Sequence, residues 1–262
     1  MATRTGFLCE PTHFQYHGAS SLPVGKKRRD GTRANVLQEQ STNDIWRCIC
    51  NSIQRVLSQH NILPSTVRGI GFDATCSLAV FAHDTDEPVS VTGPKFNNDH
   101  NVILWLDHRP IEETEKINAT KHNLLRYVGG TMSIEMEIPK VLWLKNHMPK
   151  ELFDRCKFYD LADALTHMAT GNETRSFCST VCKQGFIPVG VDGSVKGWQE
   201  DFLKEIGLGE LTEDNFKRMG GVNGVVSLLR PALASQSLRK DLEWQIPQCG
   251  RASGYSQQEG CK

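Results

Sequence analysis

Apolar side chains in the middle of the chain recur with two different spacings. The first segment has the helical spacing of three to four residues, at Ile45, Ile49, Ile53 and Val56. This spacing predicts a helix with one apolar face. Ser41 or Thr42 can cap its start, because their hydroxyls accept a bond from a free backbone N–H. Asn61 and Pro64 predict its end.

Strand-like apolar runs follow this helix. Residues 67–72 predict a buried strand, residues 78–82 a second one, and residues 102–106 a third. A polar stretch, Asp73-Ala74-Thr75-Cys76-Ser77, separates the first two runs. Such a break in a buried strand requires an explanation, since buried polar groups cost free energy unless they are hydrogen-bonded.

Helical signals resume after the third strand. Pro110, followed by acidic residues, predicts a helix start, and Gly129-Gly130 closes the helical stretch that passes through residues 124–128. Pro139 opens a further helix, and residues 160–170 form another that Gly171 stops. Strands interleaved with helices indicate an α/β protein.

Composition narrows the classes of partner and location. The 262 residues contain 30 basic and 30 acidic side chains, so the net charge is zero. We therefore expect no nucleic-acid and no membrane partner. No apolar stretch approaches the roughly 18 residues of a membrane-spanning helix, and the first thirty residues hold no signal-type apolar segment. These features predict a cytoplasmic protein.

Neither the cysteines nor the standard sequence motifs indicate a particular reaction or metal site. The nine cysteines are odd in number, and their only close spacings are Cys48-x-Cys50 and Cys178-x3-Cys182. Without a CxxC pair there is no zinc pattern, so we expect reduced thiols and no metal site. The chain also lacks GxxxxGK[ST], GxGxxG, GxSxG and HExxH. No catalytic residue follows from these patterns.

Three polar features are candidates for a binding site. The Asp73–Ser77 stretch and Asp107-His108-Arg109 both lie at ends of predicted strands, where ligands bind in open α/β sheets. Lys183 follows a segment of small residues. Each has a structural alternative: Asp73 as a cap for backbone amides, His108 and Arg109 as an ion pair at a helix start, and Lys183 as a solvated lysine.

Six segments in order resemble the FGGY family of carbohydrate kinases, most closely its pentulose kinase branch. They are EQSTNDIW (39–46), RGIGFDATCSLAVF (68–81), NVILWLDHR (101–109), YVGGTMSIEMEIPKVLWLK (127–145), FYDLADALTHMATG (158–171) and SFCSTVCK (176–183). The resemblance implies an incomplete N-terminal lobe of the ribonuclease-H-like, actin/hexokinase-type ATPase fold. It further implies ATP-dependent phosphorylation of a ketopentose such as D-ribulose, with ATP and Mg²⁺ as cofactors.

The same resemblance implies which residues bind the small-molecule sugar. The implied set is Asp73, Thr75, Cys76, Asp107, His108, Arg109 and Lys183. In the polar break, backbone groups around Cys76 would contact the ketose. A polyol needs donors and acceptors there, which accounts for the interruption of the apolar run.

The chain also departs from the family pattern. Residues 1–37 lack the family's Gly-rich phosphate hairpin, and the general-base Asp is expected in a C-terminal lobe beyond the last motif. We therefore expect an irregular segment 1–37, a sugar-binding lobe 38–220 and a poorly ordered tail 221–262. Such a chain is expected to be largely inactive alone. The alternatives are a non-catalytic sugar-binding or interaction module and an inactive truncated form.

Overall fold

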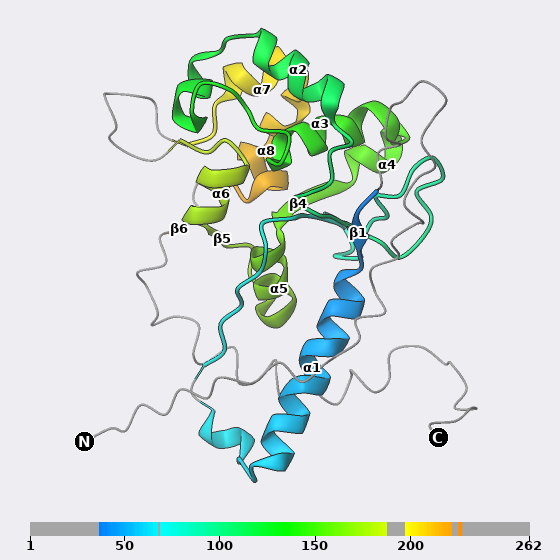
Figure 1. The fold of residues 1–262 in the computed structure, drawn as a ribbon, viewed down its shortest axis with the longest axis vertical. Helices are drawn as coiled ribbons and strands as arrows, with labels where there is room; N and C mark the ends of the chain where they lie inside the picture. The colour runs from blue at the N-terminus through cyan, green and yellow to red at the C-terminus, as the bar shows by residue number, and fades with distance from the viewer. Residues whose placement is uncertain (1–36, 68, 188–196, 222–224, 227–262) are drawn as a thin grey trace.

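The computed structural model describes residues 37–67, 69–187, 197–221 and 225–226. Segment 1–36 and residues 227–262 lie outside this part, and with them most of the predicted irregular N-terminus and poorly ordered tail. Within the described part, the structure combines helices with two sheets (Figure 1). The predicted mixture of strands and helices is confirmed.

The main sheet has four antiparallel strands in the order β1-β3-β2-β4. Its strands are β1 (Glu39–Gln40), β2 (Leu78–Ala82), β3 (Val102–Ile103) and β4 (Cys156–Asp160). Leu78 of β2 pairs with Ile103 on one side and with Asp160 on the other. The starts of β1 and β2 and the ends of β3 and β4 therefore lie together, at one end of the strands. This end of the sheet is called the site edge below.

Eight α-helices surround or extend from this sheet in the described residues. They are α1 (Thr42–Gln59), α2 (Ile111–Ala119), α3 (Glu137–His147), α4 (Lys150–Asp154), α5 (Leu161–Thr170), α6 (Phe177–Lys183), α7 (Glu200–Ile206) and α8 (Glu213–Phe216). Four 3₁₀ helices accompany them: Pro64–Thr66, Asn123–Val128, Gly209–Thr212 and Lys217–Met219. A parallel pair, β5 (Arg175–Ser176) and β6 (Val225–Val226), forms the second sheet. None of the described helices combines the length and the apolar character needed to cross a membrane.

Local capping explains why the strongest helix predictions are confirmed. The Ser41 hydroxyl accepts a bond from the Asp44 backbone N–H at the start of α1 (3.4 Å). Asp160 caps α5 in the same way through the Ala162 N–H (3.1 Å), and Gly171 ends that helix in the left-handed conformation. Helix α3 begins two residues before Pro139, whose fixed φ suits a first turn.

Two apolar clusters pack on the two faces of the main sheet. Side chains along β2 alternate between them: Leu78, Val80 and Ala82 belong to one, and Ala79 and Phe81 to the other. This is the two-residue period of a strand buried on both faces. The first cluster includes side chains of α2, α3 and α7, and the second those of α1 and α5, which lie on the opposite side of the sheet in Figure 1.

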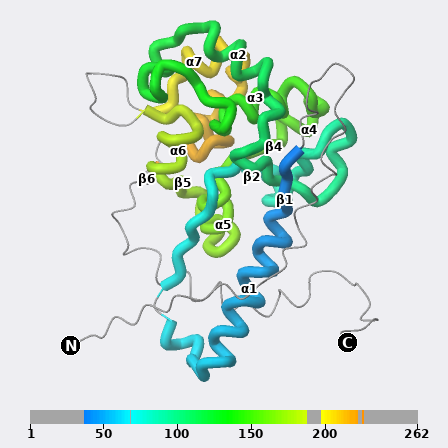
Figure 2. Tube along the Cα trace, in the orientation of Figure 1, coloured from blue at the N-terminus to red at the C-terminus, as the bar shows by residue number. Residues whose placement is uncertain are grey.

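The predicted strand at residues 67–72 is wrong. Residues 69–77 run as an extended segment toward β2 (Figure 2) but form no strand, and from Gly69 to Cys76 exposed and half-buried residues alternate. A strand needs a hydrogen-bonded neighbour, and none of the described strands lies against this segment. Phe72 instead packs beside Trp46 of α1, with ring centroids 5.9 Å apart.

Two further predictions need smaller corrections. The strand predicted at 102–106 ends at Ile103, and Trp105 and Leu106 lie in an exposed turn. The helical stretch predicted to pass through residues 124–128 is a separate 3₁₀ helix, capped by Gly129 in the left-handed conformation. In both places the apolar run continues after the backbone has already turned.

Candidate functional site

The site edge brings together segments that lie far apart in the sequence. Cys76 and Ser77 immediately precede β2, Asp160 ends β4, and Trp105 follows β3. The Ser77 hydroxyl accepts a bond from the Trp105 backbone N–H (3.2 Å). The polar break at residues 73–77 therefore leads to the place where the ends of three strands meet.

A buried polar group surrounds this edge. It consists of Glu137, Lys140, Asp160, Ser179 and Gln184, each less than 9% exposed. Gln184, next to Lys183 at the end of α6, donates from Nε2 to Glu137 Oε2 at the start of α3 (2.7 Å). Lys140, one turn along α3, donates from Nζ to the backbone oxygens of Trp105 (3.0 Å) and Glu135 (3.3 Å). These bonds tie α3 to α6 and to the turn after β3.

Three buried acceptor oxygens in this group have no hydrogen-bond partner of normal geometry. They are Glu137 Oε1, Asp160 Oδ2 and Gln184 Oε1. In each side chain the other polar atom is used: Glu137 Oε2 and Gln184 Nε2 bond to each other, and Asp160 Oδ1 caps α5. Most buried polar atoms in proteins are hydrogen-bonded, so three unpaired ones at one place make this edge a candidate ligand site.

Burial shifts the pKa values of the titratable side chains in this group. It raises the pKa of Glu137 well above its usual range, and the neighbouring Asp160 carboxyl raises it further. Burial likewise raises the pKa of Asp160 and lowers that of Lys140 to about 8. The pKa of Cys76 is raised to about 11 by burial and then by Asp160. Cys76 is therefore a neutral thiol at neutral pH and not a thiolate nucleophile.

A second buried group lies beside the first. Arg109 donates from Nε to Asp107 Oδ1 (2.9 Å), from Nη2 to Asp107 Oδ2 (2.7 Å) and to Glu39 Oε1 (2.8 Å), and from Nη1 to the Val91 carbonyl (3.1 Å). Its guanidinium carbon lies 4.8 Å from the centre of the Trp143 ring. This network joins β1 to the segment after β3. Lys140 interacts electrostatically with both groups, since Glu137 of the first and Asp107 of the second each stabilise its charged form.

The structure distributes the predicted sugar-binding residues over three environments. Cys76 and Lys183 are half-buried, and the charge of Lys183 lowers the pKa of the Cys76 thiol against the larger effect of burial. Asp107 and Arg109 are buried and belong to the hydrogen-bond network just described. Three residues are exposed: Asp73, Thr75 and His108, whose Nε2 lies 3.8 Å from Glu135 Oε1. A role in sugar binding stays a prediction for all seven.

Sequence patterns did not point to Glu137, Lys140, Asp160 or Gln184 as site residues. A signal was present for two of them: Glu137 and Lys140 are three residues apart on one helix, and a charged pair at that spacing in an otherwise apolar segment is unusual on a buried face. Asp160 is recognisable as a helix cap, which hides any second role. Gln184 gives no signal without the fold.

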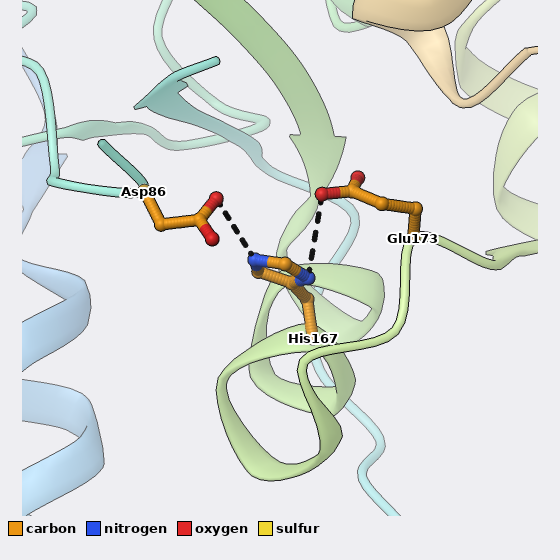
Figure 3. A group of neighbouring side chains, drawn as sticks. All are labelled: Asp86, His167 and Glu173. Carbon is orange, nitrogen blue, oxygen red and sulfur yellow. Dashed lines mark ion pairs between the residues drawn. The ribbon is translucent and has the colours of Figure 1, made fainter. Parts of the chain in front are cut away.

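One group outside the site edge has the residue types of a metal site. Asp86, His167 and Glu173 bring their ligand atoms within 4.8 Å of one another, and Figure 3 shows His167 between the two carboxylates. Lys157 Nζ, however, hydrogen-bonds to both Asp86 and Glu173. The lysine ammonium thus already occupies the position of a cation between the two carboxylates, and we assign the group a structural role.

This group makes the stability of the protein sensitive to acid. Burial alone would raise the pKa of Glu173, but hydrogen bonds from Lys157 and Tyr159 outweigh it and lower the pKa from 4.5 to about 2. A depressed carboxyl pKa stabilises the fold above the unfolded value, and this stabilisation is lost as the pH falls from about 4.5 toward 2. Urea unfolding at pH 5 and pH 3.5 should therefore show a smaller loss for Glu173→Gln than for the unsubstituted protein.

The exposed Glu115 of α2 provides the control for that experiment. Glu115→Gln should lose as much stability on acidification as the unsubstituted chain. Equal losses for all three proteins would show that Glu173 makes no contribution of this kind. Glu173 is about half exposed, so solvent screening keeps the expected difference small.

Comparison with known proteins decides the family. The model of the FGGY family of carbohydrate kinases, N-terminal domain, matches residues 26–207. The chain belongs to this family. A relative named D-ribulokinase from Saccharomyces cerevisiae is 55% identical over 183 residues, which is 70% of this chain and 26% of the relative. The human FGGY carbohydrate kinase domain-containing protein is 42% identical over 184 residues, 70% of this chain and 31% of that protein.

Solved structures show the same fold at low identity. A xylulose kinase from Brucella ovis superposes with a TM-score of 0.55 and 19% identity, over 72% of this chain and 35% of the other. A gluconate kinase from Lactobacillus acidophilus gives a TM-score of 0.52 and 16% identity, over 84% and 39%. The predicted actin/hexokinase-type fold is thereby confirmed. The chain spans between a quarter and a third of the length of the two curated relatives named above.

Proposed function

We propose that this chain is the sugar-binding lobe of an FGGY kinase that phosphorylates a ketopentose, with D-ribulose as the substrate. The observation that carries the proposal is the 55% identity to a relative named D-ribulokinase. The buried polar group at the site edge supports it, because a polyol needs several fixed donors and acceptors at one place. Cys76 and Lys183, half-buried beside that group, are the residues assigned to contact the sugar.

The chemistry assigned to this chain is binding and orientation. The Lys183 ammonium can donate to ketose oxygens, and the backbone around Cys76 offers further donors and acceptors. In phosphoryl transfer the protein mainly holds the reacting groups in line, so placing the sugar hydroxyl is itself a catalytic contribution. A general base is not assigned to any described residue.

The described residues at the site edge do not fit ATP with Mg²⁺. The two acids of this edge, Glu137 and Asp160, are buried, so their carboxyl groups do not reach a Mg²⁺ ion or a phosphate at the surface. The sequence has no GxxxxGK[ST] loop to cradle phosphates. We therefore derive no step through the nucleotide, and ATP use belongs to the proposal for the kinase family, not to this edge.

A thermal melt with a ligand panel tests the proposal. D-Ribulose, L-ribulose, D-xylulose and MgATP are each added at saturating concentration. A ketose at about 100 times its Kd stabilises the fold by about 2.7 kcal/mol, which for a domain of this size raises Tm by roughly 5–10 °C. We expect this rise with D-ribulose and none with MgATP.

A substitution arm places the effect at the proposed site. Lys183→Met should remove most of the ketose-induced rise, whereas Lys204→Met should keep it, because Lys204 is an exposed lysine of α7 paired with Glu200. A melt that no ketose changes would refute the proposal. A rise with MgATP and none with any ketose would contradict the assignment of the edge to sugar.

A further inference from the structure

The link between α3 and α6 fixes the position of Lys183. Gln184 follows Lys183 directly and is 3% exposed, and its Nε2 donates to Glu137 Oε2 (2.7 Å). The Gln184 backbone N–H also bonds to the Thr180 carbonyl at the end of α6 (3.1 Å). Glu137 thus holds the end of α6, so the backbone at Lys183 can move little without breaking this bond.

A glutamate at position 137 lowers the stability of the fold. It is fully buried, its Oε1 has no partner of normal geometry, and Asp160 is a neighbouring acid. A glutamine would accept the same bond from Gln184 Nε2 without placing a second carboxyl beside Asp160. Stability therefore does not explain why a glutamate is present, and buried polar groups that cost stability are typical of functional sites.

We propose that Glu137 is a positioning residue of the sugar site: through Gln184 it holds the end of α6, and with it Lys183, in the position that binds a ketopentose. The inference rests on the proposed function, since it names a residue that prepares the same site. Glu137 itself is fully buried and does not contact the sugar. It acts through Gln184 on the placement of the lysine.

Two substitutions separate positioning from a purely structural role. Glu137→Gln keeps an acceptor oxygen for Gln184 Nε2 at the same distance along the side chain. Glu137→Met keeps the volume and removes the acceptor. The matched control is Glu113 of α2, a buried glutamate whose Oε1 accepts from Asn146 Nδ2 (2.9 Å) at a different interface.

The measurement is the Kd of D-ribulose by titration calorimetry, with Tm determined for each variant without ligand. We expect Glu137→Met to weaken binding at least tenfold and to lower Tm about as much as Glu113→Met does, because each variant leaves one amide donor without its acceptor. Glu137→Gln should bind within about threefold of the unsubstituted chain. Glu113→Met should lower Tm and leave the Kd unchanged.

The outcomes distinguish this inference from the proposed function. If the unsubstituted chain binds D-ribulose and Glu137→Met binds it equally well, the positioning role is refuted and the sugar site stands. If Glu137→Gln is as weak as Glu137→Met, the link to Gln184 is not what matters and the inference fails. If the unsubstituted chain binds no ketose, the proposed function fails, and the inference with it.

Discussion

Replacing Arg109 with methionine is expected to lower the free energy of unfolding by about 3–5 kcal/mol. Arg109 is buried and forms ion pairs with Glu39 (2.8 Å) and Asp107 (2.7 Å), both buried as well. Methionine would leave two carboxylates in the interior without their cation. Removing one member of a buried charge network costs more than the network contributes, because the remaining charges stay desolvated.

Arg155 provides a matched control for this experiment. It also pairs with an aspartate through Nε, at 3.0 Å from Asp84, but both side chains are nearly half exposed. Water screens such an exposed pair, so Arg155→Met should change the free energy of unfolding much less than Arg109→Met. Urea unfolding of the two variants measures both values. Equal changes would show that burial of the Arg109 network has no special effect.

A second large effect is expected at Gly220. Its φ is +101°, which L side chains rarely adopt, and a Cβ there would overlap Cγ of Arg175. Arg175 cannot move aside easily: it is fully buried, its guanidinium carbon lies 3.4 Å from the centre of the Tyr159 ring, and Nη1 donates to the Glu173 carbonyl (2.6 Å). Backbone strain and overpacking each cost about 1–3 kcal/mol, so Gly220→Ala should destabilise by roughly 2–6 kcal/mol.

Gly171 separates the two contributions to that cost. It also has a positive φ, +67°, but nothing lies within 4 Å of a Cβ built on it. Gly171→Ala should therefore show the backbone term alone, about 1–2 kcal/mol. Thermal or urea unfolding of both variants gives the comparison. A Gly220→Ala variant no less stable than Gly171→Ala would contradict the packing of Arg175 against this turn.

The elements that sequence predicts well are those whose signals are local. Helices α1 and α5 carry their own caps, Ser41 and Asp160, and their own apolar spacing. The strand predicted at residues 67–72 fails for the opposite reason, because a strand exists only through a neighbour, which its own sequence does not specify. The exposed turn at Trp105 and Leu106 shows the same limit, since an apolar run does not reveal where the backbone turns.

For the candidate site, too, the sequence predicts some residues but not the contacts between distant segments. Lys183 and Cys76 come from two distant segments of the sequence, and in the fold the charge of the lysine acts on the Cys76 thiol. The contact between Glu137 and Gln184 spans 47 positions of sequence and depends on how α6 meets α3. For Asp107 and Arg109, the strand-end position was readable from the sequence, but not the burial that pairs them with Glu39.

The central claim is that D-ribulose binds at the site edge, and a backbone amide NMR titration of the ¹⁵N-labelled chain tests it most directly. The account predicts saturable shifts at residues 74–77, 137–140, 160 and 183–184, with little change elsewhere. Shifts gathered instead along α1, in the groove lined by Ile45, Ile49 and Ile53, or no saturable shifts at any amide, would contradict it.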